Sequence, residues 1–170
     1  MASEVFLSQE QIQARIDELA EDLNQAYQGK HPVVLGLLRG CVPFLSDLMR
    51  LFDFPFELEF LQGSSYGNAT TPQREPVLHF FGSVDWHERD VLVIDDIIDT
   101  GATLFALRRQ LLGDGARSVM ICTLLDKPSR RAVALSPDWS GFEIPDVFVV
   151  GFGMDHAGKH RGLPWIEVFS

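Results

Sequence analysis

The sequence predicts an α/β fold in which helices cover both faces of a twisted, mostly parallel sheet. Short apolar runs such as residues 33–38 alternate with segments of helical periodicity, and polar residues follow directly where several of the runs end. Apolar runs of this kind are typical of strands buried on both faces, and their alternation with helices is typical of parallel sheets. With 170 residues and 46% hydrophobic residues, the chain can fill one core. We therefore expect a single domain, residues 1–170.

The first predicted element is an amphipathic helix. Ser8 and Gln11 have the spacing of a capping box, in which each side chain accepts a hydrogen bond from the other residue's backbone. Apolar residues then recur at helical spacing from Ile12 to Leu23, and Gly29 ends the pattern.

The remaining elements alternate between strands and helices. The predicted strands are residues 33–38, 54–61, 77–81, 91–98, 118–125 and 147–150, and the further predicted helices are residues 44–49 and 104–112. Residues 63–74 are polar and rich in turn formers, which predicts a mobile loop. The tail has no clear periodicity, and we expect residues of about 150–170 to form a small hood subdomain together with the N-terminal segment.

Charge and composition narrow the class of protein. The net charge of −10 and the pI near 4.8 argue against binding of nucleic acid through backbone phosphates. An anionic ligand must therefore be held by a few local cations, backbone N–H groups or a metal ion. The chain has two cysteines without a disulfide framework, no secretory h-region and no membrane-length apolar segment. We expect a soluble cytoplasmic protein that binds neither membranes nor nucleic acid.

The clearest functional signal is the segment 91–104, VLVIDDIIDTGATL, where a strand ends in acids and a helix begins. Thr100 and Thr103 supply hydroxyls, Gly101 allows close approach of the backbone, and the free N–H groups of the helix start attract an anion. Asp95 and Asp96 can accept hydrogen bonds from two sugar hydroxyls, directly or through Mg²⁺ and water. The pattern predicts a site for a phosphorylated ribose. The alternative is a simple helix cap beside two solvated acids.

This segment resembles the phosphoribosyl-diphosphate-binding motif of the type I phosphoribosyltransferases, and its flanks are similar to the hypoxanthine-guanine branch of that family. The resemblance covers nearly the whole chain. It implies the type I phosphoribosyltransferase fold and Mg²⁺-dependent transfer of the 5-phosphoribosyl group from 5-phosphoribosyl 1-diphosphate to hypoxanthine or guanine. The products would be IMP or GMP and pyrophosphate, and the protein would be a homodimer or homotetramer.

The resemblance also implies roles within the motif. Asp95 and Asp96 would hold the ribose diol and its Mg²⁺. Asp99 would be the general base that takes the proton from the purine. The residues implied to bind the ribose and its 5′-phosphate are Asp95, Asp96, Asp99, Thr100, Gly101, Ala102 and Thr103. Many relatives carry Glu-Asp in place of Asp95-Asp96, so a water can bridge the shorter side chain of Asp95.

Two further segments are similar to parts of the family that handle pyrophosphate and exclude water. Arg39 and Gly40 follow the first buried strand and match the family's pyrophosphate loop, and Arg161 matches a second pyrophosphate-binding cation. Ser65 and Tyr66 match the lid that closes over the reacting centre. Taken alone, Arg39 would be an ordinary surface arginine and the lid a flexible loop.

The resemblance to the family implies that four residues bind the purine. Lys127 would donate to the exocyclic oxygen, and its ammonium has donors only, which favours a 6-oxopurine over adenine. Phe148 would stack on the base and the Val149 backbone would contact the ring edge. Asp155 would lie beside the base and ligate a second Mg²⁺. Without the likeness, Lys127 would be a solvated lysine and Phe148 a core residue.

The sequence also contains two incomplete motifs and is compatible with two other functions. Residues 153–160 fall one residue short of a triphosphate-binding loop, because His160 replaces the required Ser or Thr, and His156 and His160 have metal spacing only if they share a helix. The alternative functions are transfer to another base, such as xanthine, adenine or a pyrimidine, and non-catalytic sensing of phosphoribosyl diphosphate. A sensor of that kind would want an added DNA-binding domain or a basic face.

Overall fold

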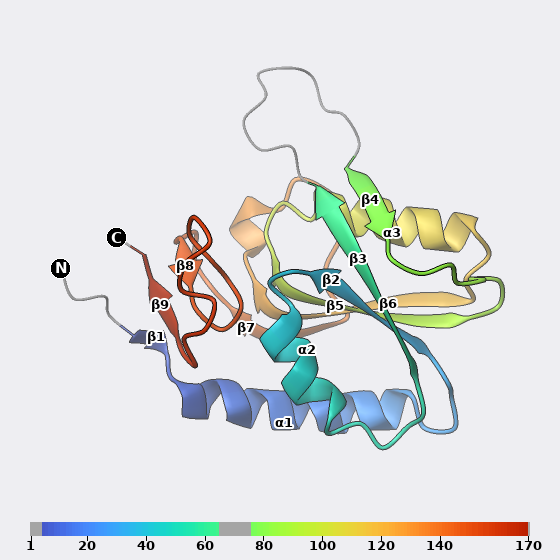
Figure 1. The fold of residues 1–170 in the computed structure, drawn as a ribbon, viewed down its shortest axis with the longest axis horizontal. Helices are drawn as coiled ribbons and strands as arrows, with labels where there is room; N and C mark the ends of the chain where they lie inside the picture. The colour runs from blue at the N-terminus through green and yellow to red at the C-terminus, as the bar shows by residue number, and fades with distance from the viewer. Residues whose placement is uncertain (1–4, 65–75, 170) are drawn as a thin grey trace.

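The structure, a computed structural model, describes residues 5–169 except 65–75 (Figure 1). Two sheets are formed within the described residues. The strands are β1 (Val5–Leu7), β2 (Val33–Leu38), β3 (Glu57–Ser64), β4 (Val77–Phe80), β5 (Asp90–Ile98), β6 (Ser118–Asp126), β7 (Trp139–Glu143), β8 (Val149–Val150) and β9 (Ile166–Val168). The helices are α1 (Gln9–Ala26), α2 (Val42–Met49), α3 (Ala102–Gly113) and the one-turn 3₁₀ helix η1 (Pro128–Arg130).

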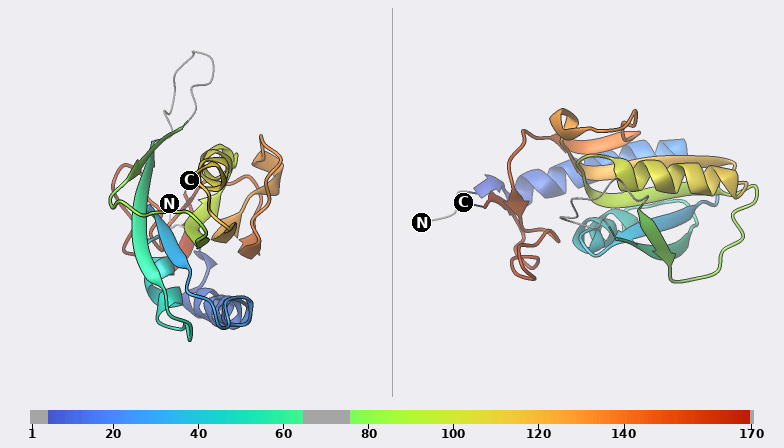
Figure 2. Two further views of the ribbon diagram at one scale, coloured as in Figure 1. Left: turned by 90° about the vertical axis from the view of Figure 1, so that its right-hand side faces the viewer. Right: turned by 90° about the horizontal axis from the view of Figure 1, so that it is seen from above.

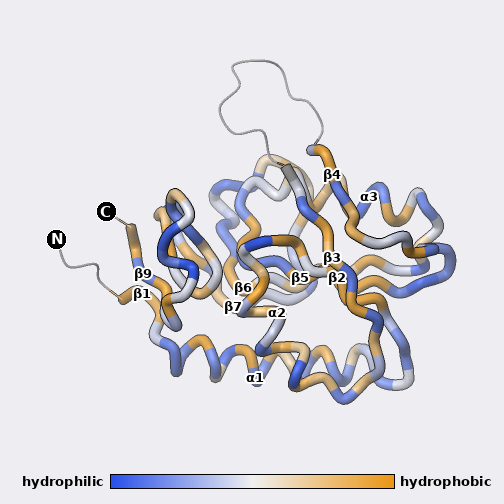
Figure 3. The backbone as a smooth tube through the Cα atoms, in the orientation of Figure 1, coloured by the Kyte–Doolittle hydropathy of each residue, from blue (hydrophilic) through white to orange (hydrophobic). Residues whose placement is uncertain are grey.

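The helix α1 begins where the capping box predicts. The Gln11 backbone N–H donates to Ser8 Oγ at 3.2 Å, and the Ser8 backbone N–H donates to Gln11 Oε1 at 2.8 Å. Figure 3 shows hydrophobic and hydrophilic residues alternating along the helix. Its buried residues are Ile12, Ile16, Leu19, Ala20 and Leu23. The predicted apolar stripe is therefore the face that packs on the core.

The central sheet has the strand order β4-β3-β2-β5-β6-β7, and every pair except the antiparallel β3–β4 pair is parallel. Alternate side chains of β2 and β5 point to opposite faces. Val34 and Leu92 join the core under α1 and α2, whereas Leu35 and Val93 join the core under α3. Figure 2 shows the sheet between these helices from two further directions. The predicted α/β class, with helices on both faces, is confirmed.

Chain connectivity places a crevice at one edge of this sheet. From β2 the chain passes through α2 to β3 on one side, and from β5 it passes through α3 to β6 on the other side. Because β2 and β5 are neighbours, the two connections leave in opposite directions at their carboxyl ends. Open α/β sheets bind ligands at such a topological switch point.

The second sheet has the order β1-β9-β8 and joins both ends of the chain beside the central sheet (Figure 1). We call this sheet and the loop of residues 151–165 the hood. The prediction that residues 147–150 complete the parallel sheet is wrong, because only Val149–Val150 form a strand and that strand pairs with β9. The pairing of such a short strand depends on a segment elsewhere in the chain. The local run of apolar residues does not show which segment that is.

Other boundaries differ from the predictions. The predicted strand at 54–61 begins later, at Glu57, because Phe54 and Phe56 pack with Phe52 in an aromatic cluster before the strand. The strand β7 was not predicted. Most of the predicted loop at 63–74 lies outside the described residues. No helix within the described part of the chain has the length and apolar character needed to cross a membrane.

Candidate functional site

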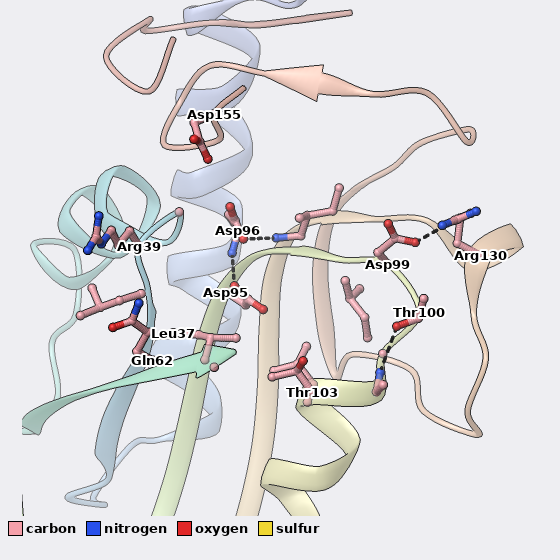
Figure 4. A pocket seen from close by; sticks show the side chains of 18 of the residues that line it. Leu37, Arg39, Gln62, Asp95, Asp96, Asp99, Thr100, Thr103, Arg130 and Asp155 are labelled. Atoms are coloured by element: carbon pink, nitrogen blue, oxygen red, sulfur yellow. Dashed lines mark hydrogen bonds and ion pairs between the residues drawn. The ribbon is translucent and has the colours of Figure 1, made fainter. Parts of the chain in front are cut away.

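A cavity of about 880 Å³ lies at the crevice between the carboxyl ends of β2 and β5 (Figure 4). Its walls come from the loop after β2, the end of β3, the end of β5 with the start of α3, the segment after β6, and the hood. The lining residues are 37–40, 62–63, 95–104, Arg130, Asp155 and Arg161. Residues remote in sequence thus meet in one place, as the alternating α/β pattern requires.

Two neighbouring acids form the floor of the cavity. Asp95 is buried, and Asp95 Oδ1 accepts a hydrogen bond from the Asp96 backbone N–H at 2.9 Å. Asp96 Oδ1 accepts one from the Ile97 backbone N–H at 2.9 Å. Burial, followed by the charge of Asp96, raises the pKa of Asp95 well above its ordinary value. Burial also raises the pKa of Asp96, although hydrogen bonds and the charge of Arg161 oppose that rise.

This acid pair fits a divalent cation in composition but does not form a complete cage. Within the described residues no three acids, histidines or cysteines converge closely enough to hold an ion. Mg²⁺ is commonly bound through one or two carboxylates, with waters and substrate oxygens filling the other positions. Two desolvated carboxylates at the floor of an open cavity provide that kind of site, because a cation offsets the cost of their burial.

The 37–40 loop, which comprises the last two residues of β2 and the turn after it, approaches the acids more closely than a side chain at Gly40 would allow. A Cβ atom on Gly40 would lie 1.7 Å from Asp96 Oδ2. With Asp96 in this position, only glycine fits at residue 40. The Leu38–Arg39 peptide bond is cis. Arg39 is exposed, and Figure 4 shows its guanidinium turned away from Asp96.

The phosphate turn, residues 99–103, leads from β5 into α3. Gly101 is the N-cap of α3 and has a φ of +79°, a conformation that favours glycine. Thr100 Oγ1 accepts a hydrogen bond from the Ala102 backbone N–H at 3.4 Å. The first N–H groups of a helix have no intrahelical partner, so the start of α3 offers donors and the positive end of its dipole to an anion.

The segment 127–132 is bonded along the outside of this turn. The Lys127 backbone N–H donates to the Ile98 carbonyl at 3.0 Å, and the Ala132 backbone N–H donates to the Thr100 carbonyl at 2.9 Å. Arg131 donates to the Asp99 carbonyl at 2.6 Å and also pairs with the Asp126 carboxylate. The phosphate turn is therefore fixed from outside by a second stretch of main chain.

The hood contributes an ion pair to the open side of the cavity. Arg161 Nη2 lies 2.7 Å from Asp155 Oδ1, and Arg161 Nη1 donates to the Gly153 carbonyl at 2.5 Å. Asp155 Oδ2 accepts from the Gly158 backbone N–H at 2.8 Å. Residues 151–160 form turns and isolated bridges instead of a helix, as expected, so His156 and His160 do not share a helical face.

The structure brings most of the predicted site residues to the cavity wall. They are Arg39, Gly40, Asp95, Asp96, Asp99, Thr100, Gly101, Ala102, Thr103, Asp155 and Arg161. Three predicted base-binding residues do not line it. Lys127 is buried at the start of η1, Val149 is buried in β8, and Phe148 is 52% exposed with its ring near His156 and Phe169. The predicted lid residues Ser65 and Tyr66 lie outside the described part of the chain.

Among the polar residues and glycines that line the cavity, three carry no role in the sequence-based prediction. Gln62 and Gly63 lie near the carboxyl end of β3, and a Cβ on Gly63 would lie 2.9 Å from Thr103 Cγ2, so β3 closely approaches the phosphate turn. Arg130 is the third, and its guanidinium contacts Asp99. In the sequence, the only sign of a special role for Gly63 is that it is a glycine. No feature of the sequence distinguishes the role of Arg130 from that of its neighbour Arg131.

Comparison with known proteins agrees with this geometry. The phosphoribosyl transferase domain family matches residues 4–157. The hypoxanthine-guanine phosphoribosyltransferase of Lactococcus lactis is 46% identical over 98% of this chain and 90% of the relative. The enzyme of the same name from Bacillus subtilis is 42% identical over 98% of this chain and 92% of the relative.

A solved structure gives the same result at the level of the fold. The crystal structure of a hypoxanthine phosphoribosyltransferase from Staphylococcus aureus matches with a TM-score of 0.90 and 37% identity, covering 98% of this chain and 91% of that one. Sequence, topology and the position of the cavity thus agree. The chain belongs to the phosphoribosyl transferase family, in its hypoxanthine-guanine branch.

Proposed function

We propose that this protein is a purine salvage enzyme that transfers the 5-phosphoribosyl group from 5-phosphoribosyl 1-diphosphate to hypoxanthine or guanine. The observation that carries the proposal is the placement of an acid pair, the buried Asp95 and the half-buried Asp96, between the 37–40 loop and the start of α3. A ribose whose hydroxyls meet the acids would have its 5′-phosphate at the helix start and its pyrophosphate near the 37–40 loop.

Binding of this polyanionic substrate to an acidic protein depends on local charge. The N–H groups of residues 101–103 and the hydroxyls of Thr100 and Thr103 would hold the 5′-phosphate. Arg39 and Arg161 would meet the pyrophosphate, for which Arg161 must leave its pair with Asp155. Mg²⁺ held by Asp95 and Asp96, with Asp155 near a second ion, would neutralise charge on the leaving pyrophosphate.

In the reaction, purine N9 bonds to C1′ of the ribose while the bond from C1′ to the pyrophosphate oxygen breaks. The proton on purine N7 passes to the carboxylate of Asp99. Lys127 would donate to the 6-oxo group, with Phe148 stacked on the ring and the Val149 backbone at its edge. Lys127 and Phe148 do not line the cavity of the free protein. We therefore expect the segments that carry these two residues to move toward the cavity when the purine binds.

The test is an assay of purified protein with phosphoribosyl diphosphate, Mg²⁺ and a panel of free bases, followed by pyrophosphate release. We expect product with hypoxanthine, guanine or both, and little with adenine. Product only with xanthine or a pyrimidine would reassign the base. Tight binding of phosphoribosyl diphosphate without turnover of any base would identify a sensor. Light scattering on the same sample tests the expected homodimer or homotetramer.

A further inference from the structure

We propose that Arg130 is a positioning residue, which holds the carboxylate of Asp99 in the orientation needed to receive the purine proton. The inference rests on the proposed function, because it concerns the base of that reaction. Arg130 lines the cavity, and its Nε donates to Asp99 Oδ1 at 3.1 Å (Figure 4).

The contact uses only one oxygen of the carboxylate. In the part of the chain that the structure describes, no group donates a hydrogen bond to Asp99 Oδ2. Rotation about the side-chain bonds of an aspartate would otherwise let either oxygen face the substrate at many angles. With Oδ1 bound to Arg130, Oδ2 is left as the acceptor for the N–H of the purine.

A second acid lies near the same nitrogen of Arg130. Asp146 Oδ1 lies 3.8 Å from Arg130 Nε, and Asp146 is two residues before the predicted base-stacking residue Phe148. Arg130 thus pairs with an acid of the phosphate turn and lies near an acid of the segment that leads to Phe148. These contacts connect Asp99 to the segment expected to move when a base binds.

The main chain of Arg130 is fixed independently of these side-chain contacts. Arg130 ends η1, which begins with Pro128, and its backbone N–H donates to the Lys127 carbonyl at 3.1 Å. The next residue, Arg131, is largely buried and is bonded to the Asp99 carbonyl and the Asp126 carboxylate. The guanidinium of Arg130 is therefore presented to Asp99 from a rigid support, which is what orientation of a reactive group requires.

Exposure separates this role from a stabilising one. The side chains of Arg130, Asp99 and Asp146 are 48%, 43% and 56% exposed. Ion pairs at that exposure contribute little to the stability of a fold, because water screens the charges and the side chains lose rotamer freedom. Arg131 is the contrasting case, since its side chain is only 12% exposed and it fixes the backbone of the phosphate turn. Loss of Arg130 should change turnover but not folding.

The experiment compares Arg130→Gln with Arg130→Lys and with the control Arg50→Gln. Arg50→Gln removes an exposed arginine that pairs with Asp47 outside the cavity. For Arg130→Gln we expect kcat to fall about three- to tenfold, with KM for phosphoribosyl diphosphate and the melting temperature unchanged. The Lys variant should recover part of kcat. An unchanged or raised kcat in Arg130→Gln overturns the proposal.

A double-mutant cycle shows whether the effect passes through Asp99. In an Asp99→Asn background, Arg130→Gln should cause no further loss of kcat, because the proton acceptor is already absent. An equal loss in both backgrounds would mean that Arg130 acts elsewhere, and would overturn the proposal. Wild-type protein that forms no nucleotide from any base refutes the proposed function and this inference together. Active wild type with a normal Arg130→Gln variant refutes the inference alone.

Discussion

Gly153 of the hood packs against Gly40 of the 37–40 loop. A Cβ atom on Gly153 would lie 2.1 Å from the Gly40 carbonyl oxygen, and the φ of Gly153 is +98°. Gly40 in turn packs against the carboxylate of Asp96. The hood therefore contacts the 37–40 loop of the proposed pyrophosphate site, and that loop contacts Asp96 of the proposed ribose site. Each contact is made at a glycine that has no side chain to separate the two segments.

The variant Gly153→Ala should separate the hood from the 37–40 loop. The new methyl group meets a backbone atom, which cannot turn aside as a flexible side chain can. We expect a loss of about 3 kcal/mol in the free energy of unfolding and a several-fold rise in KM for phosphoribosyl diphosphate. Urea unfolding and steady-state kinetics measure the two effects.

Gly158→Ala is the matched control for this prediction. Gly158 has a φ of +78°, but a Cβ there would meet nothing within 4 Å. Both variants carry the strain of a positive φ, about 1–2 kcal/mol, and only Gly153→Ala adds the collision. Equal effects of the two variants would show that backbone strain, and not the contact with Gly40, explains the loss.

Much of the fold could be predicted because its signals are local. The capping box of Ser8 and Gln11 determines where α1 begins, and the apolar strand at residues 33–38 is visible in a short stretch of sequence. The strands that escaped prediction depend on distant partners. Residues 139–143 form an edge strand of half-exposed residues around Gly141, so they show no buried run. The strand β9, which also escaped prediction, pairs with Val149–Val150 and belongs to the tail, which has no visible periodicity.

The candidate site divides in the same way. Residues 95–103 are contiguous, and their types and spacing alone predict a phosphate turn beside two acids. Arg130 contacts Asp99 across 31 positions of sequence, and its neighbour Arg131 is identical in type. Only the course of η1 determines which arginine reaches the carboxylate and which holds the backbone. Close approaches such as that of Gly40 to Asp96 likewise depend on packing between separate elements.

Replacement of Asp99 by Asn tests the proposed base. Asn keeps the size of the side chain and the main-chain contacts of the phosphate turn but cannot take a proton. We expect kcat to fall about 100-fold or more, while the dissociation constant for phosphoribosyl diphosphate stays within a few-fold of wild type. Pre-steady-state kinetics and calorimetric titration measure these quantities. Turnover close to wild type would exclude Asp99 as the base.

Lys127 is predicted to determine the preference for 6-oxopurines. In Lys127→Met the buried stem is largely preserved and the donors are lost. A hydrogen bond from a charged donor is worth roughly 1.5–3 kcal/mol, so the ratio of kcat/KM for hypoxanthine to that for adenine should fall about 10- to 100-fold. Circular dichroism confirms that the variant is folded. A variant that retains the wild-type ratio would remove Lys127 from base recognition.

The buried carboxylate of Asp90, at the start of β5, should make stability depend on pH. Asp90 accepts hydrogen bonds from Arg117 Nε at 3.1 Å, Arg117 Nη2 at 2.6 Å and Ser118 Oγ at 2.6 Å. The Arg117 hydrogen bonds lower the pKa of Asp90 below its ordinary value, and they outweigh the opposing effect of burial. This site lies at the end of β5 opposite the acid pair, so it affects folding separately from the proposed chemistry.

The sign follows from the lowered pKa. In the unfolded chain Asp90 titrates near an aspartate's ordinary pKa of about 3.9, and in the folded protein it titrates lower. Its ion pair therefore contributes fully to stability above that value, and the contribution is lost as the pH falls through the folded pKa. Asp90→Asn should cost about 2 kcal/mol at pH 7, and the difference from wild type should shrink in more acidic solution. Urea unfolding between about pH 7 and pH 3 measures this, with the exposed Asp53→Asn as control. If the difference in free energy of unfolding between wild type and Asp90→Asn stays constant over that range, Asp90 acts through packing alone. A contribution from the ion pair would instead decrease as the carboxylate becomes protonated.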